Sequence, residues 1–171
     1  TYTIEQGYGS RVVAKGTGFL LNNEMHDFNM HPGVTDMNGR IVTPPNLIAP
    51  NKRMLSSMSP TLVLRDGEPF LATGSPGGRT IINTVLQIIV NVIDFGMDVQ
   101  QAVDEPRIHH QWLPDRVNME QTLESIEAAM QDRGHTTRMV RSQGDAHSIL
   151  VRDGRMYPGV DSRARGGAAG Y

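Results

Sequence analysis

The sequence predicts an α+β fold in which helices cover an antiparallel sheet. Three observations predict it: Asp-Gly turns join paired β-type segments at two places, apolar runs with helical spacing lie between those places, and 18 glycines and 10 prolines mark frequent turns. A chain of 171 residues with 38% hydrophobic residues can bury one core and is short for two. We therefore expect a single domain over residues 1–171.

The N-terminal third is expected to hold strands and a long loop. Residues 1–6 combine β-branched and aromatic residues, which favours a strand, and residues 19–21 are typical of a short buried strand. Residues 29–51 are rich in proline and show no periodicity, so they predict a loop. Loops of this length often serve as lids or binding loops.

The remaining two thirds predict two hairpins separated by helices. The residues between 81 and 95 carry their polar side chains in one narrow stripe, which indicates a helix buried on most of its circumference. The expected elements, in order, are strands 61–65 and 68–73 around Asp66-Gly67, helices 81–95, 98–105 and 120–133, and strands 147–151 and 156–157 around Asp153-Gly154.

Composition excludes several classes of function. A net charge of −2 gives no electrostatic support for nucleic acid or an anionic membrane as partner, and the absence of cysteine excludes thiol nucleophiles and disulfides. Polar residues interrupt the most apolar stretch, so no membrane span is expected. The six histidines lack an i, i+4 pair, so neither a metal site nor a cofactor is expected. Arg107 is expected to be a structural ion-pair partner.

Three groups of residues could carry chemistry. Residues 74–78, rich in glycine between a strand and a helix, offer amides to an oxyanion, although such glycines also serve close packing. Ser56 and Ser57 precede a strand and could bind a carboxylate, or could cap a turn. Glu24 and Asp27 follow a predicted strand and could bind an ammonium group, or could be solvated surface side chains.

Four segments together resemble a known family: residues 21–28, 51–61, 73–78 and 105–114. In this order they closely resemble the small, C-terminal subunit of bacterial gamma-glutamyltranspeptidase, and the resemblance covers essentially the whole chain. It implies the N-terminal-nucleophile hydrolase fold, an α-β-β-α sandwich. It also implies that a precursor cleaves itself into two chains that remain together as a heterodimer, so the expected partner is the large subunit.

The resemblance implies a gamma-glutamyltransferase and glutathione hydrolase without a cofactor. A threonine at the small subunit's N-terminus attacks a gamma-glutamyl amide such as that of glutathione, with its own α-amine as the base, and the acyl group passes to an amino acid or water. Family members are usually periplasmic or extracellular. By the family's pattern, this chain is truncated before that threonine, Thr1 is not the nucleophile, and the sheet is incomplete at its N-terminal strand. We therefore expect the isolated fragment to be inactive and to self-associate through the exposed sheet edge.

The resemblance also implies roles for individual residues. The expected catalytic residues are Thr3, whose hydroxyl supports the nucleophile, and Gly77 and Gly78, whose amides stabilise the oxyanion. The expected substrate-binding set is Thr3, Glu5, Glu24, Asp27, Ser56, Ser57, Met58, Gly77 and Gly78. Within it, the acidic residues bind the substrate's α-amine and the two serines its α-carboxylate.

One departure from the family's pattern and two alternatives to the gamma-glutamyl interpretation stay open. Residues 29–51 resemble the family's lid, but Asn38 stands where some members carry an aromatic gate. A related amide acylase of the glutaryl-cephalosporin type is the nearest enzymatic alternative. From a different class, the chain could be a catalytically inactive binding or scaffold fragment.

Overall fold

The computed structural model describes residues 3–33 and 35–170, and the chain divides into two compact units, residues 1–58 and 59–171. The expectation of a single domain over residues 1–171 stays a prediction.

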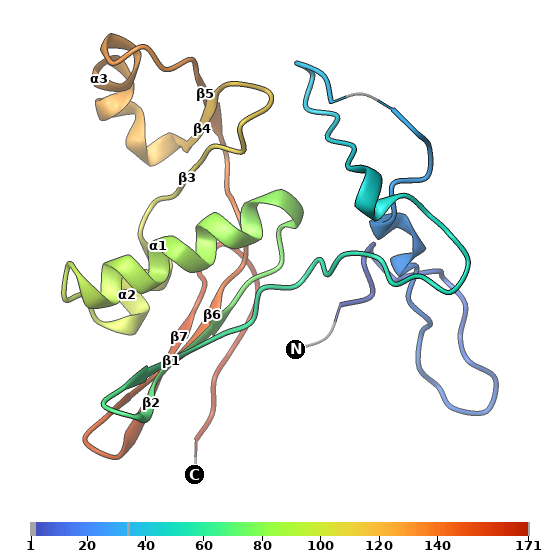
Figure 1. Ribbon diagram of the computed structural model, residues 1–171. Helices are drawn as coiled ribbons and strands as arrows, with labels where there is room; N and C mark the ends of the chain where they lie inside the picture. The colour runs from blue at the N-terminus through green and yellow to red at the C-terminus, as the bar shows by residue number, and fades with distance from the viewer. Residues whose placement is uncertain (1–2, 34, 171) are drawn as a thin grey trace. The chain divides into compact units, whose positions relative to one another are not determined.

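A four-stranded antiparallel sheet organises the C-terminal unit (Figure 1). Its strands are β1 (Thr61–Arg65), β2 (Glu68–Gly74), β6 (His147–Arg152) and β7 (Arg155–Val160), in the order β1-β2-β6-β7. Both predicted hairpins are confirmed. Asp66, Gly67, Asp153 and Gly154 all have positive φ, which is the backbone that a two-residue turn needs to match the twist of its strands.

Two helices cover one face of this sheet, α1 (Ile81–Ile93) and α2 (Val99–Asp104) (Figure 1). Asp98 caps α2 through a capping box with Gln101, as its sequence predicts. The close approach of α2 to β7 depends on Gly159, where a Cβ atom would lie 2.7 Å from the Val99 carbonyl oxygen. The core between helices and sheet consists of Phe70, Leu71, Ile88, Val92, Val99, Ala102, Val103, Ala146 and Leu150.

As expected, α1 is buried or half-buried on most of its circumference, but its exposed stripe is apolar rather than polar. Ile82 and Leu86 are 66% and 55% exposed, whereas the polar stripe faces protein. Gln87 donates from Nε2 to the Ile108 carbonyl at 2.8 Å and accepts from the Ile108 amide at 3.0 Å. The stripe is thus polar because it binds the main chain of the neighbouring segment.

That neighbouring segment belongs to a second, small sheet that the sequence did not predict. Its strands are β3 (Ile108–His109), β4 (Val117–Glu120) and β5 (Thr137–Val140), and the β4–β5 pair is parallel. The helix expected over residues 120–133 is only partly present. The segment contains the 3₁₀ helix η4 (Gln121–Ile126) followed by the short helix α3 (Glu127–Asp132), and Glu120 belongs to β4, where it is buried.

Buried charges join the two sheets. The Arg107 guanidinium pairs with Asp161 at 2.8 Å, and both side chains are nearly inaccessible, which confirms the predicted structural role of Arg107. Arg163 bridges Glu120 at 2.6 Å and Asp161 at 3.0 Å. Burial opposes ionisation of Asp161, but backbone amides and both guanidinium groups more than offset it and lower the pKa of its carboxyl.

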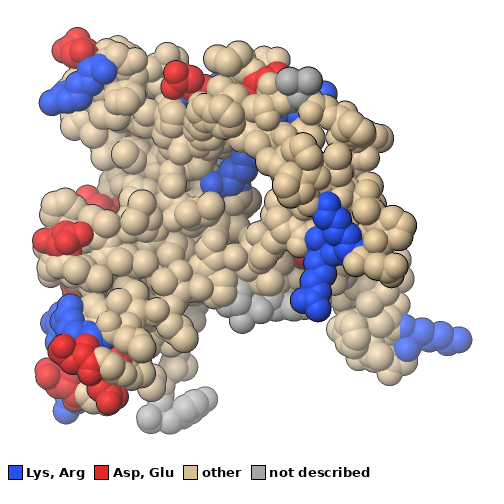
Figure 2. Space-filling view, viewed as in Figure 1, with Lys and Arg blue, Asp and Glu red and all other residues tan. Residues whose placement is uncertain are grey.

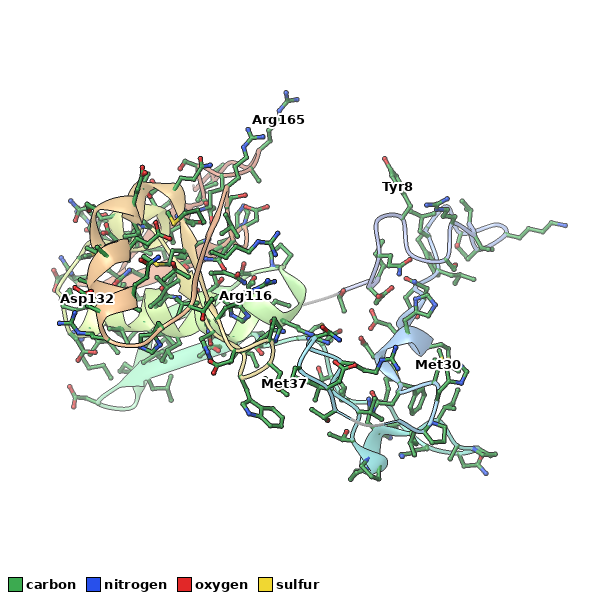
Figure 3. All side chains as sticks on the ribbon, turned by 90° about the horizontal axis from the view of Figure 1, so that it is seen from above. Tyr8, Met30, Met37, Arg116, Asp132 and Arg165 are labelled. Carbon is green, nitrogen blue, oxygen red and sulfur yellow. The ribbon has the colours of Figure 1, made fainter. Side chains whose placement is uncertain are left out.

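The N-terminal unit holds two 3₁₀ helices, η1 (Glu24–Asp27) and η2 (Pro44–Asn46), and isolated bridges such as Val13 with Leu20. The predicted loop over residues 29–51 is confirmed for its described residues, with only η2 as a regular element. Tyr8 projects from this unit and is 73% exposed (Figure 3).

The two strands expected in this unit are wrong. Residues 1 and 2 lie outside the described residues, and residues 3–6 are irregular, with a bend at residues 5 and 6. At this bend Glu5 has φ +69° and its amide donates to Thr3 Oγ1 at 3.0 Å. A hydroxyl that captures the amide two residues on competes with strand pairing. The segment 19–21 pairs only through a single bridge at Leu20, and Phe19 is 56% exposed.

Candidate functional site

Glu24 and Asp27 form an acidic pair at the two ends of η1. A 3₁₀ helix has about three residues per turn, so side chains three apart lie on the same side. The two carboxyl groups share a hydrogen bond, which together with burial and the charge of Asp27 raises the pKa of Glu24 to about 7. The pair therefore holds one proton in slightly acidic solution.

One oxygen of each carboxyl group in this pair has no partner. When both carboxyl groups are ionised and share no proton, Glu24 Oε1 and Asp27 Oδ2 are buried and accept no hydrogen bond from the residues that the structure describes. Buried polar atoms are nearly always hydrogen-bonded, so two adjacent exceptions require an explanation. A cationic donor placed between the two carboxyl groups would satisfy both oxygens.

Ser57 and Glu5 complete this acidic site. Ser57 Oγ donates to Glu24 Oε2 at 3.4 Å, which places a hydroxyl beside the acidic pair. Glu5 accepts from Asn23 Nδ2 at 2.5 Å, and its negative charge contributes to the raised pKa of Glu24. The predicted residues Thr3, Glu5, Glu24, Asp27 and Ser57 therefore lie in one unit, where Ser57 contacts the acidic pair directly and Glu5, bonded to Thr3, acts on Glu24 through its charge.

Residues that sequence reasoning missed hold this arrangement in place. Asn46 is buried, donates from Nδ2 to the Asp27 carbonyl at 2.6 Å and accepts the Leu55 amide at 3.0 Å, so it joins η1 to the segment that carries the serines. His26 Nδ1 lies 3.6 Å from Glu5 Oε2 and 3.3 Å from Asn23 Nδ2. An asparagine in a loop gives no sequence signal for such a role.

Ser56 and Met58 are not brought to the acidic pair by a hydrogen bond. Ser56 is exposed, and its Oγ accepts the Met58 amide at 3.2 Å, which is the turn-capping geometry that the sequence left open. Met58 is 38% exposed. Their assignment to substrate binding stays a prediction.

Gly77 and Gly78 lie in the C-terminal unit, where β2 leads through the 3₁₀ helix η3 (Gly78–Thr80) into α1. Their φ angles are +143° and +57°, and both are exposed. A Cβ atom on Gly77 would lie 2.5 Å from Thr80 Oγ1, whereas one on Gly78 would meet nothing within 4 Å. The first amides of a helix have no acceptor inside it, so this loop suits an oxyanion.

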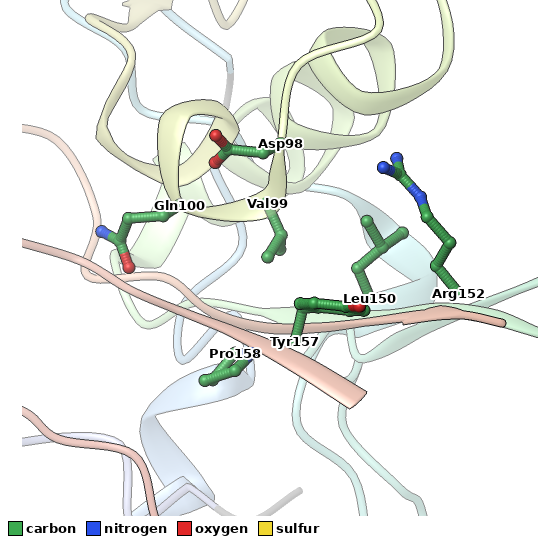
Figure 4. A pocket seen from close by; sticks show the side chains of 7 residues that line it. All are labelled: Asp98, Val99, Gln100, Leu150, Arg152, Tyr157 and Pro158. Carbon is green, nitrogen blue, oxygen red and sulfur yellow. The ribbon is translucent and has the colours of Figure 1, made fainter. Parts of the chain in front are cut away.

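A pocket elsewhere in this unit contains none of the predicted site residues. It lies between α2 and the last two strands (Figure 4) and is lined by Asp98, Val99, Gln100, Leu150, Arg152, Tyr157 and Pro158. The described residues contain no group of three His, Cys, Asp or Glu side chains able to hold a metal ion. On the face of the molecule seen in Figure 2, the lysine and arginine side chains are scattered rather than gathered into a patch.

Among the described residues, no helix is both long enough and apolar enough to cross a membrane.

Comparisons with known proteins identify the family. The sequence model of the family described as Gamma-glutamyltranspeptidase matches residues 1–171. The chain is 45% identical over 170 residues to the glutathione hydrolase proenzyme of Escherichia coli K12, covering 96% of this chain and 29% of that protein. It is 37% identical over 172 residues to the glutathione hydrolase proenzyme of Bacillus subtilis 168, covering 99% of this chain and 27% of that protein. The chain thus spans less than a third of these relatives.

Solved structures agree. The T380A mutant of Helicobacter pylori gamma-glutamyltranspeptidase is 44% identical, with a TM-score of 0.86 over 96% of this chain and 91% of that chain. The Pseudomonas nitroreducens gamma-glutamyltranspeptidase complexed with L-DON is 39% identical, with a TM-score of 0.86 over 100% of this chain and 91% of that chain. The predicted α+β fold of the N-terminal-nucleophile hydrolase type is confirmed. The chain belongs to the gamma-glutamyltranspeptidase family.

Proposed function

We propose that the protein containing this chain transfers or hydrolyses gamma-glutamyl groups of glutathione and related amides, and that this chain binds the glutamyl group. The observation that carries the proposal is the acidic pair with its two unpartnered buried oxygens, Glu24 Oε1 and Asp27 Oδ2. An α-ammonium group supplies the positive charge and the N–H donors that these oxygens lack.

The neighbouring hydroxyl favours an α-amino acid over a simple amine. In a glutamyl group the ammonium and the carboxylate are attached to the same carbon, so their binding groups must be adjacent. Ser57 Oγ lies 3.4 Å from Glu24 Oε2, beside an acceptor for the ammonium. Its single hydrogen would turn from this long bond with Glu24 to the substrate carboxylate. Glu5 adds a third acidic group, and we assign Ser56 and Met58 to the carboxylate side of the same site.

The proposed reaction is acyl transfer through a threonyl ester. The nucleophile is an N-terminal threonine of the processed protein, and none of the described residues is assigned that role. Its hydroxyl oxygen attacks the γ-carbonyl carbon while its α-amine takes the proton, and the carbonyl oxygen becomes an oxyanion that the Gly77 and Gly78 amides stabilise. The C–N bond then breaks, the leaving amine takes the proton, and water or an amino acid releases the acyl group. Thr3 is assigned to support the nucleophile.

A second chain from the same precursor is the proposed partner. Leu62, Ile149 and Met156 are 78%, 43% and 76% exposed. The register of the strands and the alternation along β6 place them on the sheet face opposite α1 and α2. An apolar sheet face suits a second sheet packed against it, as an α-β-β-α sandwich requires. We also propose that the whole protein is periplasmic or extracellular, and that this chain self-associates without its partner.

The test is hydrolysis of a gamma-glutamyl anilide by the full, processed protein and its Asp27→Ala variant. Charge-assisted hydrogen bonds contribute roughly 1.5–3 kcal/mol, so we expect KM to rise by about 10-fold to 150-fold. Asp132→Ala, at an exposed position at the end of α3, is the matched control and should leave KM unchanged. An unchanged KM in Asp27→Ala would contradict the assignment of the acidic pair.

The same assay separates the two alternatives. A glutaryl anilide has no α-ammonium group, so faster turnover of glutaryl than gamma-glutamyl anilide would favour an acylase of the cephalosporin type. A processed protein that releases no aniline from either substrate would favour an inactive binding or scaffold protein.

A further inference from the structure

The two amides proposed to stabilise the oxyanion belong to peptide planes whose carbonyl oxygens are hydrogen-bonded to hydroxyl groups. In a trans peptide the N–H of one residue points opposite to the C=O of the residue before it. The only cis peptide among the described residues is Leu113-Pro114, so both planes in question are trans. Holding the Pro76 carbonyl therefore fixes the direction of the Gly77 N–H, and holding the Gly77 carbonyl fixes the Gly78 N–H.

Ser75 holds the first plane. Its Oγ donates to the Pro76 carbonyl oxygen at 2.7 Å. Ser75 Oγ in turn accepts the Asp145 amide at 3.0 Å, across 70 residues of sequence, so the hydroxyl is itself held in place by a second loop. Proline has no amide hydrogen, so the Ser75-Pro76 peptide cannot donate in place of this hydroxyl.

Thr80 holds the second plane. Its Oγ1 donates to the Gly77 carbonyl oxygen at 3.0 Å, and its backbone amide donates to the same oxygen at 3.1 Å. The Gly77 carbonyl thus accepts two hydrogen bonds from one residue of η3. Rotation of the Gly77-Gly78 peptide would break both.

Close packing beneath the loop limits other arrangements. A Cβ atom on Gly144 would lie 2.7 Å from Ser75 Oγ and 2.9 Å from Thr84 Oγ1, so only glycine leaves room for the Ser75 hydroxyl there. A Cβ atom on Gly77 would lie 3.4 Å from the Gly144 Cα. The 144–145 loop therefore packs directly against the loop that presents the two amides.

We propose that Ser75 and Thr80 are positioning residues that preorganise the oxyanion-binding amides of Gly77 and Gly78 by fixing the two peptide planes. The proposal rests on the proposed function, in which these amides stabilise the tetrahedral oxyanion. Preorganised donors are effective because they do not have to reorient as charge develops in the transition state. Neither hydroxyl contacts the substrate in this proposal.

The test compares steady-state kinetics of the full, processed protein with those of Ser75→Ala and Thr80→Val, using a gamma-glutamyl anilide. Loss of one oxyanion donor lowers kcat by roughly 100-fold to 1,000-fold in other hydrolases, so a donor that is only misdirected should lower kcat by about 10-fold or more. KM should stay within about 2-fold because the oxyanion does not exist in the bound substrate. Thr80→Ser keeps the hydroxyl and should restore kcat, which a role in packing alone would not produce.

Crystal structures of the two variants supply a readout that does not depend on activity. We expect a rotated Pro76-Gly77 peptide in Ser75→Ala and a rotated or disordered Gly77-Gly78 peptide in Thr80→Val. Absence of wild-type anilide turnover would refute the proposed function, while the crystal structures would still test the fixing of the planes. Unchanged kcat in both variants, or unrotated peptides, would overturn the present proposal, as would a rise in KM with kcat unchanged.

Discussion

Replacing Asp161 with asparagine should destabilise the C-terminal unit strongly, because it leaves the Arg107 guanidinium buried without its carboxylate. The two side chains are 0% and 2% exposed and meet at 2.8 Å. Asp161 also accepts the Ala146 amide at 2.7 Å and Arg163 NH1 at 3.0 Å. Removing one partner of a buried ion pair costs about 3–5 kcal/mol. Asparagine keeps the shape and one acceptor oxygen, so we expect a loss near 3 kcal/mol, the lower end of that ~3–5 kcal/mol range.

Thermal and urea unfolding of the protein measure this loss. For a chain of 150–250 residues, about 3 kcal/mol lowers Tm by roughly 6–12 °C. Asp115→Asn is the matched control: its carboxylate pairs with His110 at 3.0 Å but is 77% exposed, so its removal should change stability by less than about 0.5 kcal/mol. Equal losses in the two variants, or a loss below about 1 kcal/mol in Asp161→Asn, would refute the role of the buried network.

The pH dependence of the same comparison has a definite sign. The pKa of Asp161 is lower in the folded protein than in the unfolded chain. Ionisation of Asp161 therefore stabilises the fold fully at pH values above the pKa of the unfolded chain. This stabilisation is lost as the pH falls through the lower pKa of the folded protein. The difference in stability between wild type and Asp161→Asn should therefore shrink in acid. A difference that grows on acidification would contradict this linkage.

Three further predictions concern the acidic pair, the helix–sheet contact and the partner surface. Because the pKa of Glu24 is about 7, KM for a gamma-glutamyl anilide should fall as the pH rises through 7 and Glu24 ionises beside Asp27. The Glu24→Gln variant should lack this pH dependence of KM, and a dependence that persists would show that a different residue titrates. Gly159→Ala should cost about 1–3 kcal/mol in urea unfolding because its Cβ would meet the Val99 carbonyl, whereas Gly7→Ala, with open space, should cost less. Leu62→Asp should reduce copurification of the large chain; undiminished recovery would exclude that sheet face as the contact.

The parts of the fold that the sequence predicts are those governed by local chemistry. Asp66-Gly67 and Asp153-Gly154 determine their turns with two residues each, and Asp98 caps α2 within one turn of helix. β3 has two residues and β4 pairs with β5 in parallel, so neither carries a local signal. Glu120 belongs to a strand because it accepts the Arg107 and Gln143 amides, contacts that no pattern around residue 120 reveals.

The residues of the candidate site also fall into a group that the sequence predicts and a group that it does not. Its chemistry-bearing residues could be named in advance because carboxylates, hydroxyls and paired glycines lie in motifs that resemble a family. The groups that orient them could not, because Asn46 acts through the main chain at Asp27 and Leu55, and Thr80 through the main chain at Gly77. The position of the main-chain group that such a side chain binds depends on the tertiary fold, so the local sequence does not reveal the contact.

Two features that cost this chain stability when considered alone are both explained by a bound partner, one by a substrate and the other by a second chain, in the proposed function. The acidic pair keeps two buried oxygens unpartnered, and the faces of α1 and the sheet keep Leu86 and Leu62 exposed. Desolvated acceptors and exposed apolar rows are both unfavourable unless something binds them. In the proposed function, an ammonium group satisfies the first and a second chain covers the other. If so, substrate and partner should each raise the Tm of the protein, and the two increments should differ in salt dependence, since screening weakens the ionic contact and leaves the apolar one intact.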